Sequence, residues 1–289
     1  MAAVAWQDGY YWTRDGVRLH YRDYAGPDTR PTLLCLPGLT RNGRDFAPLA
    51  ERLAGQWRVI CLSLRGRGES GYAKDPLTYV PLTYMQDIDA LLRTLELSRV
   101  AIIGTSLGGV IAMMMAPSYA REISGVLLND IGPVLERAGL MRIRNHMSRS
   151  GGWPSWLHVA RDLAQSHGAI YPRYQISDWL RMAKQLCRVA PSGRIQLDYD
   201  PRIAEPFRLP QPEVTSDLWT GLEALSDKAV LSVRGAHSDI LSAETQARMK
   251  ARLPQLQCAT IADVGHSPTL CEPQAISAVD TWLAQVAAQ

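Results

Sequence analysis

The sequence predicts an α/β fold in which helices flank a mostly parallel sheet and a helical cap is inserted between two strands. Three observations lead to this prediction. Short apolar runs alternate with amphipathic stretches along most of the 289 residues. A Gly-x-Ser-x-Gly motif joins one of these runs to an apolar helical stretch. One long stretch, residues 131–212, interrupts the alternation and has no pattern of a buried strand.

Six apolar runs have the length of strands, and several are apolar at nearly every position. That pattern is typical of parallel strands covered on both faces. The runs occupy residues 32–36, 58–64, 100–104, 125–129, 229–233 and 257–261. Amphipathic helical patterns at 82–97, 243–253 and 273–286 lie between or after them, and this alternation favours a parallel sheet with helices on both sides. An alternating segment around Asp15-Gly16 predicts an N-terminal hairpin.

Residues 131–212 are rich in Trp, Arg, Pro and Gly and carry short helical patterns. We therefore expect a core formed by residues 1–130 and 213–289, with a helical cap at 131–212 covering the active site. The cap holds 12 Lys and Arg against 6 Asp and Glu, whereas the remainder holds 19 against 22. This net charge of +6 has two interpretations, an anionic substrate or partner, or solvated arginines on exposed helices. The second is the more common situation.

The motif Gly104-Thr105-Ser106-Leu107-Gly108 has a buried strand before it and an apolar helix after it. This is the context of a nucleophile elbow, a turn so tight that side chains two residues to either side of the serine would collide. The sequence therefore predicts Ser106 as a nucleophile. The Leu107 N–H, at the start of the helix, would then donate to a developing oxyanion.

A serine nucleophile needs a base, and the base needs a carboxylate that orients it. We expect His266 to be the base, because it follows the last predicted strand and should return to the sheet edge that holds Ser106. His237 is the alternative. Asp239, in the loop after the penultimate strand, is the expected acid. The chain order Ser106, Asp239, His266 is then nucleophile, acid, base, which is the order typical of enzymes with a nucleophile elbow. Asp130, directly after residues 125–129, is the rival acid.

A second oxyanion donor should come from the loop after the first buried strand. This loop reads Leu36-Pro37-Gly38-Leu39, and Gly38 would let the backbone approach the substrate closely. The backbone N–H of Leu39 is therefore the expected donor, alongside that of Leu107.

On these motifs, the chain resembles the α/β-hydrolase family over nearly its whole length. Residues 65–70 (RGRGES) match the family's R-G-x-G-x-S loop, which should brace the site loops. Pro37 and Ser63 depart from the family pattern, which often has His and Asp there. Within the family, the chain is similar to capped serine hydrolases of small esters, enol-lactones and ring-cleavage products.

The resemblance implies hydrolysis of a small carboxylic ester or lactone through an acyl-enzyme on Ser106. The alternative in the same fold is a carbon–carbon bond hydrolase of a vinylogous diketone acid. A remote alternative is a non-catalytic binding protein with a hydrolase fold.

Composition and residue spacing indicate the cellular setting and the kinds of molecule that the protein binds. The five cysteines are scattered without disulfide or zinc spacing, and the first residues lack a signal-peptide pattern. Both features favour a reduced, cytoplasmic setting. No apolar run is long enough to span a membrane, and the basic residues form no recognised nucleic-acid module. We expect a small-molecule substrate and no metal or cofactor.

Overall fold

A computed structural model describes residues 6–147, 152–208 and 217–289. Within these residues the main sheet has eight strands in the order β1-β2-β4-β3-β5-β6-β9-β10. Strand β2 is antiparallel to β1 and β4, and every other neighbouring pair is parallel. The strands are β1 (Trp6–Trp12), β2 (Arg18–Tyr24), β3 (Thr32–Leu36), β4 (Val59–Ser63), β5 (Val100–Thr105), β6 (Ile123–Asn129), β9 (Ala229–Gly235) and β10 (Gln257–Ile261). The expected sheet and N-terminal hairpin are confirmed.

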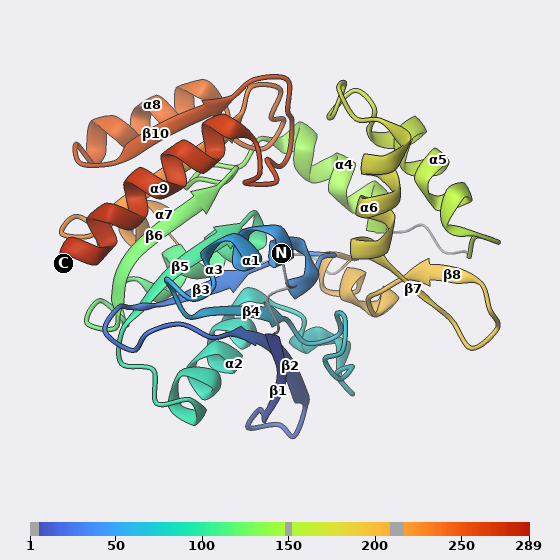
Figure 1. Cartoon of the computed structure of the whole chain (residues 1–289), viewed down its shortest axis with the longest axis horizontal. Coiled ribbons are helices and arrows are strands. Elements are labelled where there is room, and N and C mark those ends of the chain that lie inside the picture. Colours follow the sequence, from blue (N-terminus) through green and yellow to red (C-terminus); the bar gives the residue numbers. More distant parts are fainter. Residues whose placement is uncertain (1–5, 148–151, 209–216) are drawn as a thin grey trace.

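Helices cover both faces of this sheet (Figure 1). Buried side chains of α2, α3, α7 and α8 pack on one face, and those of α1 and α9 pack on the other. The elements are α1 (Ala47–Leu53), α2 (Pro81–Thr94), α3 (Leu107–Met115), α7 (Leu218–Glu223), α8 (Ala243–Arg252), α9 (Pro273–Ala288), and the short 3₁₀ helices η1 (Gly43–Phe46) and η2 (Pro76–Thr78). Strands β3 to β6 are buried at almost every position, which explains their nearly continuous apolar sequence.

Most of the described chain between β6 and α7, called here the insert (residues 137–147 and 152–208), stands to one side of the sheet in Figure 1. It contains α4 (Arg137–Met147), α5 (Trp156–His167), α6 (Ile176–Leu186), β7 (Cys187–Val189), β8 (Ile195–Leu197), η3 (Pro201–Ala204) and η4 (Pro206–Arg208). Strands β7 and β8 form an antiparallel pair that the sequence did not predict. Each strand has three residues, too few for an alternating pattern to be recognised.

Helix α6 illustrates why the insert is helical and how it packs. Gln175 and Asp178 form a capping box, in which each side chain accepts a hydrogen bond from the other residue's backbone. The buried side chains of α6 recur every three or four residues, at Trp179, Met182, Ala183 and Leu186. The face that they form packs against α5.

Hydrogen bonds that are at least partly buried attach the insert to the core. The Asp198 carboxylate, 2% exposed, accepts from Arg44 Nη2 at 2.5 Å, and the Asp198 carbonyl accepts from the Gly68 amide at 3.0 Å. The Gln185 carbonyl accepts from Asn42 Nδ2 at 3.1 Å. The partners are more than 100 residues apart in the sequence, so these are long-range contacts. They hold the insert against the loops after β3 and β4.

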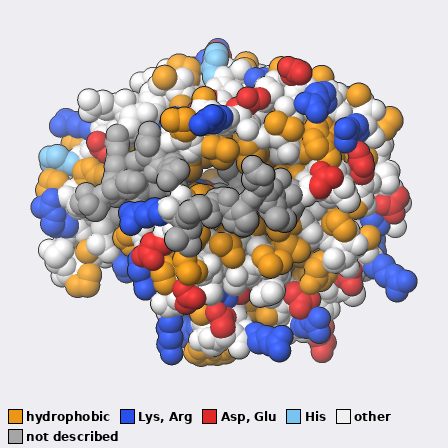
Figure 2. Space-filling view, turned by 180° about the vertical axis from the view of Figure 1, so that it is seen from behind, with side chains coloured by type: hydrophobic (Ala, Val, Ile, Leu, Met, Phe, Trp, Pro, Cys, Tyr) orange, Lys and Arg blue, Asp and Glu red, His pale blue; other side chains and the backbone are white. Residues whose placement is uncertain are grey.

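No helix among the described residues is both long and apolar enough to span a membrane. On the face seen in Figure 2, acidic and basic side chains are interspersed among apolar ones.

Candidate active site

Ser106 occupies the turn between β5 and α3 in a strained conformation, with φ 51° and ψ −115°. Such a conformation costs a residue with a side chain about 1–3 kcal/mol, and the surrounding structure must impose it. Two glycines make the turn possible. A Cβ on Gly104 would lie 2.6 Å from the Gly108 backbone, and a Cβ on Gly108 would lie 2.1 Å from the Leu36 carbonyl oxygen. The turn therefore has the geometry that the motif predicted.

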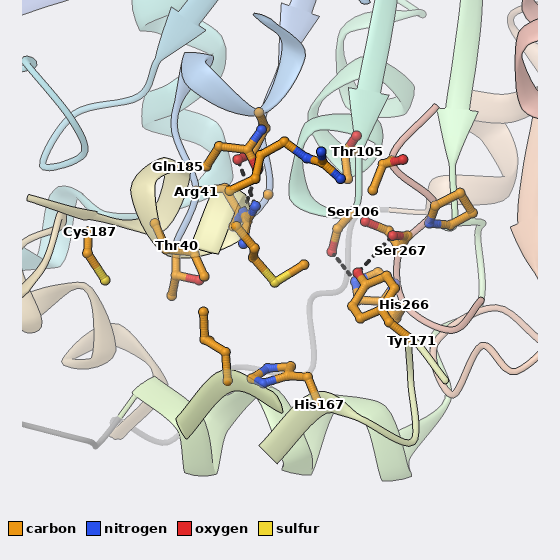
Figure 3. A pocket seen from close by; sticks show the side chains of 18 of the residues that line it. Thr40, Arg41, Thr105, Ser106, His167, Tyr171, Gln185, Cys187, His266 and Ser267 are labelled. Carbon is orange, nitrogen blue, oxygen red and sulfur yellow. Dashed lines mark hydrogen bonds and ion pairs between the residues drawn. The ribbon is translucent and has the colours of Figure 1, made fainter. Parts of the chain in front are cut away.

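A chain of hydrogen bonds runs from Ser106 through His266 to Asp130. His266 Nε2 lies 3.0 Å from Ser106 Oγ, and its Nδ1 lies 2.7 Å from Asp130 Oδ2. Figure 3 labels Ser106 and His266. With its proton on Nδ1, the imidazole donates to Asp130 and can accept the serine proton. This arrangement activates a serine hydroxyl for nucleophilic attack.

The Asp130 carboxylate is fully buried and held by more than the histidine. It accepts from the Gly235 amide at 2.8 Å and from Ser238 Oγ at 2.6 Å. Asp130 also has a positive φ of 56°, which aspartate tolerates better than most residues. These hydrogen bonds, from the last residue of β9 and from the loop that follows it, fix the carboxylate against His266.

Asp239 does not contact His266, and the expectation that it orients the histidine is wrong. Its two carboxylate oxygens instead accept from Arg142 of α4, at 2.6 Å from Nε and 2.7 Å from Nη2. Burial raises the pKa of Asp239, but Arg142 outweighs this and holds it below the usual value. The rival acid, Asp130, directly after β6, lies beside His266 instead, with its Oδ2 2.7 Å from the histidine Nδ1.

The sequence reasoning also missed Asn129, the last residue of β6. Its Nδ2 donates to Thr105 Oγ1 at 3.0 Å and to the Pro268 carbonyl at 2.9 Å. Asn129 thus connects the residue before Ser106 to the loop that carries His266. A polar side chain at the end of an apolar strand, next to Asp130, was the available signal.

The loop after β3 approaches the elbow at Gly38, where a Cβ would lie 3.8 Å from Ser106 Cβ. The next residue, Leu39, lines the same cavity, and its carbonyl accepts from Arg67 Nε at 2.9 Å. Arg67 is fully buried, so the R-G-x-G-x-S loop braces this loop as the sequence predicted. Leu107 is the first residue of α3, so its amide is at the N-terminus of the helix.

A cavity of about 560 Å³ opens above Ser106, between the core loops and the insert. Three arginines line it, and each is paired with an aspartate. Arg41 pairs with Asp45, Arg142 with Asp239, and Arg181 with Asp178. Among the residues that the structure describes, the basic composition of the insert therefore does not give the cavity unpaired arginines.

Other reactive groups in the cavity have different environments. Burial raises the pKa of Cys187 to about 12, so this thiol stays protonated near neutral pH and is not a competing nucleophile. The Tyr171 hydroxyl donates to the Ser267 carbonyl at 2.9 Å and so contacts the loop of His266. Within residues 6–147, 152–208 and 217–289, no group of three or more His, Cys, Asp or Glu is arranged to hold a metal ion.

Comparison with known proteins identifies the class. Residues 33–279 match the alpha/beta hydrolase family, and the chain belongs to that family. It is 34% identical over 267 residues to a 3-hydroxybutyrate-oligomer hydrolase from Cupriavidus necator, covering 90% of each chain. It is 26% identical to a 2-(acetamidomethylene)succinate hydrolase from Mesorhizobium japonicum, covering 84% of each. A crystal structure of an alpha/beta hydrolase from Novosphingobium aromaticivorans superimposes with a TM-score of 0.93 at 47% identity, covering 99% of each chain.

Proposed function

We propose that the protein is a serine hydrolase of carboxylic esters, in which Ser106 is the nucleophile, His266 the base and Asp130 the acid. The observation that carries the proposal is the hydrogen-bond chain from Ser106 Oγ to His266 at 3.0 Å and from His266 to Asp130 at 2.7 Å. A buried carboxylate, a histidine and a strained serine at a sheet edge are costly to keep without a chemical role.

The reaction proceeds in two steps. Ser106 Oγ attacks the ester carbonyl carbon while His266 Nε2 takes its proton, and the backbone N–H groups of Leu39 and Leu107 donate to the oxyanion. The carbon–oxygen bond to the alcohol breaks, and His266 returns the proton to the departing alkoxide. Water, activated by His266, then hydrolyses the acyl-enzyme and releases the acid.

For the substrate class we propose short linear esters of hydroxy acids. The relative from Cupriavidus necator, named for 3-hydroxybutyrate oligomers, matches 90% of the chain. A cavity of about 560 Å³ is of the size that encloses a small ligand, so it suits an oligomer of a few units. Residues 131–212 act as the cap over the substrate in this proposal, and the core is formed by 1–130 and 213–289.

The nucleophile is tested with a fluorophosphonate probe and an ester assay. Wild type should be labelled at Ser106. S106A should remain folded, escape labelling and lose about 10⁶-fold in kcat. S166A is the matched control, because Ser166 also lines the cavity and its Oγ lies 2.8 Å from His167 Nδ1. Absence of labelling in folded wild type would refute the proposal and favour a non-catalytic binding protein.

The bond type is tested with a panel of 3-hydroxybutyrate dimers and trimers, simple esters, lactones and vinylogous diketone acids. The proposal predicts the highest kcat/KM for the oligomers. A higher kcat/KM for the diketone acids would instead support carbon–carbon bond hydrolysis at the same serine.

A further inference from the structure

Arg41 lies beside the nucleophile but belongs to neither the hydrogen-bond chain nor the oxyanion donors. Its amide donates to the Gly38 carbonyl at 3.1 Å, which turns the loop after Leu39. A Cβ on Gly38 would lie 3.4 Å from Arg41 Cγ and 3.8 Å from Ser106 Cβ. Arg41 and Ser106 therefore flank the same glycine, and Figure 3 shows both side chains at the same end of the cavity.

The Arg41 guanidinium is bound on one edge only. Its Nε and Nη2 donate to the two Asp45 oxygens at 2.5 and 2.7 Å. Burial lowers the pKa of Arg41, but Asp45 more than compensates and leaves it above the usual value, so the side chain stays charged. In the part of the chain that the structure describes, no protein group accepts a hydrogen bond from Nη1. Both residues line the cavity.

A guanidinium already neutralised by a carboxylate is a poor partner for a second carboxylate. The pair instead offers a donor, Nη1, next to an acceptor, Asp45. A hydroxyl group both donates and accepts, so it is the ligand that matches the pair. Because Arg41 lies next to Ser106, a hydroxyl group bound by the pair must be close to the carbonyl carbon that Ser106 attacks.

In an acyl chain attached to Ser106 Oγ, the oxygen on the β-carbon is two carbons away from the carbonyl carbon. We propose that the Arg41–Asp45 pair is a subsite that binds the free 3-hydroxyl group of the acyl unit. The inference rests on the proposed role of Ser106 and specifies the substrate further. It implies that oligomers are cut one unit at a time from the end that carries the free hydroxyl.

The test compares methyl 3-hydroxybutyrate, as both enantiomers, with methyl butyrate, by following acid release. One hydrogen-bonded pair of this kind corresponds to a preference of about 10- to 100-fold in kcat/KM for the better hydroxy enantiomer. R41Q and D45N should each bring this ratio close to one. The matched control is R181Q, because Arg181 also lines the cavity and is paired with an aspartate, Asp178, and it should keep the wild-type ratio.

Because Arg41 also shapes its loop, R41Q is first labelled with the fluorophosphonate probe to establish that Ser106 still reacts. If R41Q does not react, D45N carries the test, because it exchanges one acceptor oxygen of the carboxylate for an NH₂ donor and keeps Arg41. A trimer of 3-hydroxybutyrate with its terminal hydroxyl acetylated should be cleaved more slowly than the free trimer. An unchanged ratio in the reactive variants, or wild type that does not distinguish the two methyl esters, would overturn the subsite. Wild type that neither labels nor cleaves any ester would refute the proposed function instead.

Discussion

Replacing Asp130 by Asn distinguishes the two carboxylates that the sequence left in competition. The Asp130 carboxylate accepts from His266 Nδ1 at 2.7 Å, from the Gly235 amide and from Ser238 Oγ. An asparagine can keep its oxygen on the Gly235 amide, and its NH₂ group then faces His266. That group donates to Nδ1, which forces the histidine proton onto Nε2, and a protonated Nε2 cannot accept the serine proton.

From this change of tautomer we expect kcat to fall about 10⁴-fold, which corresponds to roughly 5 kcal/mol in the barrier. The isosteric change should leave the fold intact, which circular dichroism and thermal unfolding can establish. The kcat is measured with a saturating chromogenic ester, and the rate of Ser106 labelling provides a second readout that does not depend on substrate binding.

Asp239→Asn is the matched control. It breaks the ion pair with Arg142, whose two side chains are 27% and 35% exposed, and a pair of this exposure contributes up to about 1 kcal/mol. We expect kcat to fall less than about 10-fold, since the contact between His266 and Asp130 is retained. If D239N lost 10³-fold or more while D130N stayed active, the assignment of Asp130 as the acid would be refuted.

Three further substitutions test the stability and shape of the fold. Arg65 lowers the pKa of Asp15 to about 2. A folded pKa below the unfolded one stabilises the protein above about pH 4, and this contribution is lost as the pH falls toward 2. As the pH falls over that range, the melting temperature of D15N should therefore decrease less steeply than that of wild type. Parallel plots of melting temperature against pH would contradict the reasoning. G104A should cost about 3 kcal/mol or more in urea unfolding, because its Cβ would lie 2.6 Å from the Gly108 backbone. G38A should keep its stability, because the nearest atom to its Cβ is at 3.4 Å, yet lose ester turnover, because the methyl group faces Ser106. Equal stability of the two variants would argue against the steric account of the elbow.

The sheet and the elbow were predictable from sequence because both depend on local patterns. Continuous apolar runs identify buried parallel strands, and the glycines around Ser106 record a steric requirement of one turn. His266 followed from chain order, since the loops after parallel strands meet at one edge of the sheet.

The acid was not predictable with the same certainty. Asp130 and Asp239 follow β6 and β9, which are adjacent, so either loop can reach His266. The partner that occupies Asp239 is Arg142, 97 residues away on a helix of the insert. No sequence pattern reveals a contact over that separation. For the same reason the pairing of each cavity arginine with an aspartate was not visible in the net charge.

The insert also affects the charge near His266, because Arg142 belongs to it. Asp239 is close enough to His266 for a protonated histidine to lower its pKa, so an unpaired Asp239 would be a second negative charge near the imidazole. Two such charges would stabilise the imidazolium and make it a poorer acid, so that it would return the proton to the leaving group less readily. Arg142 pairs with Asp239, whereas Asp130 is the carboxylate in hydrogen-bond contact with the histidine. Helix α4 carries Arg142, so the insert contributes to the charge balance around Asp239.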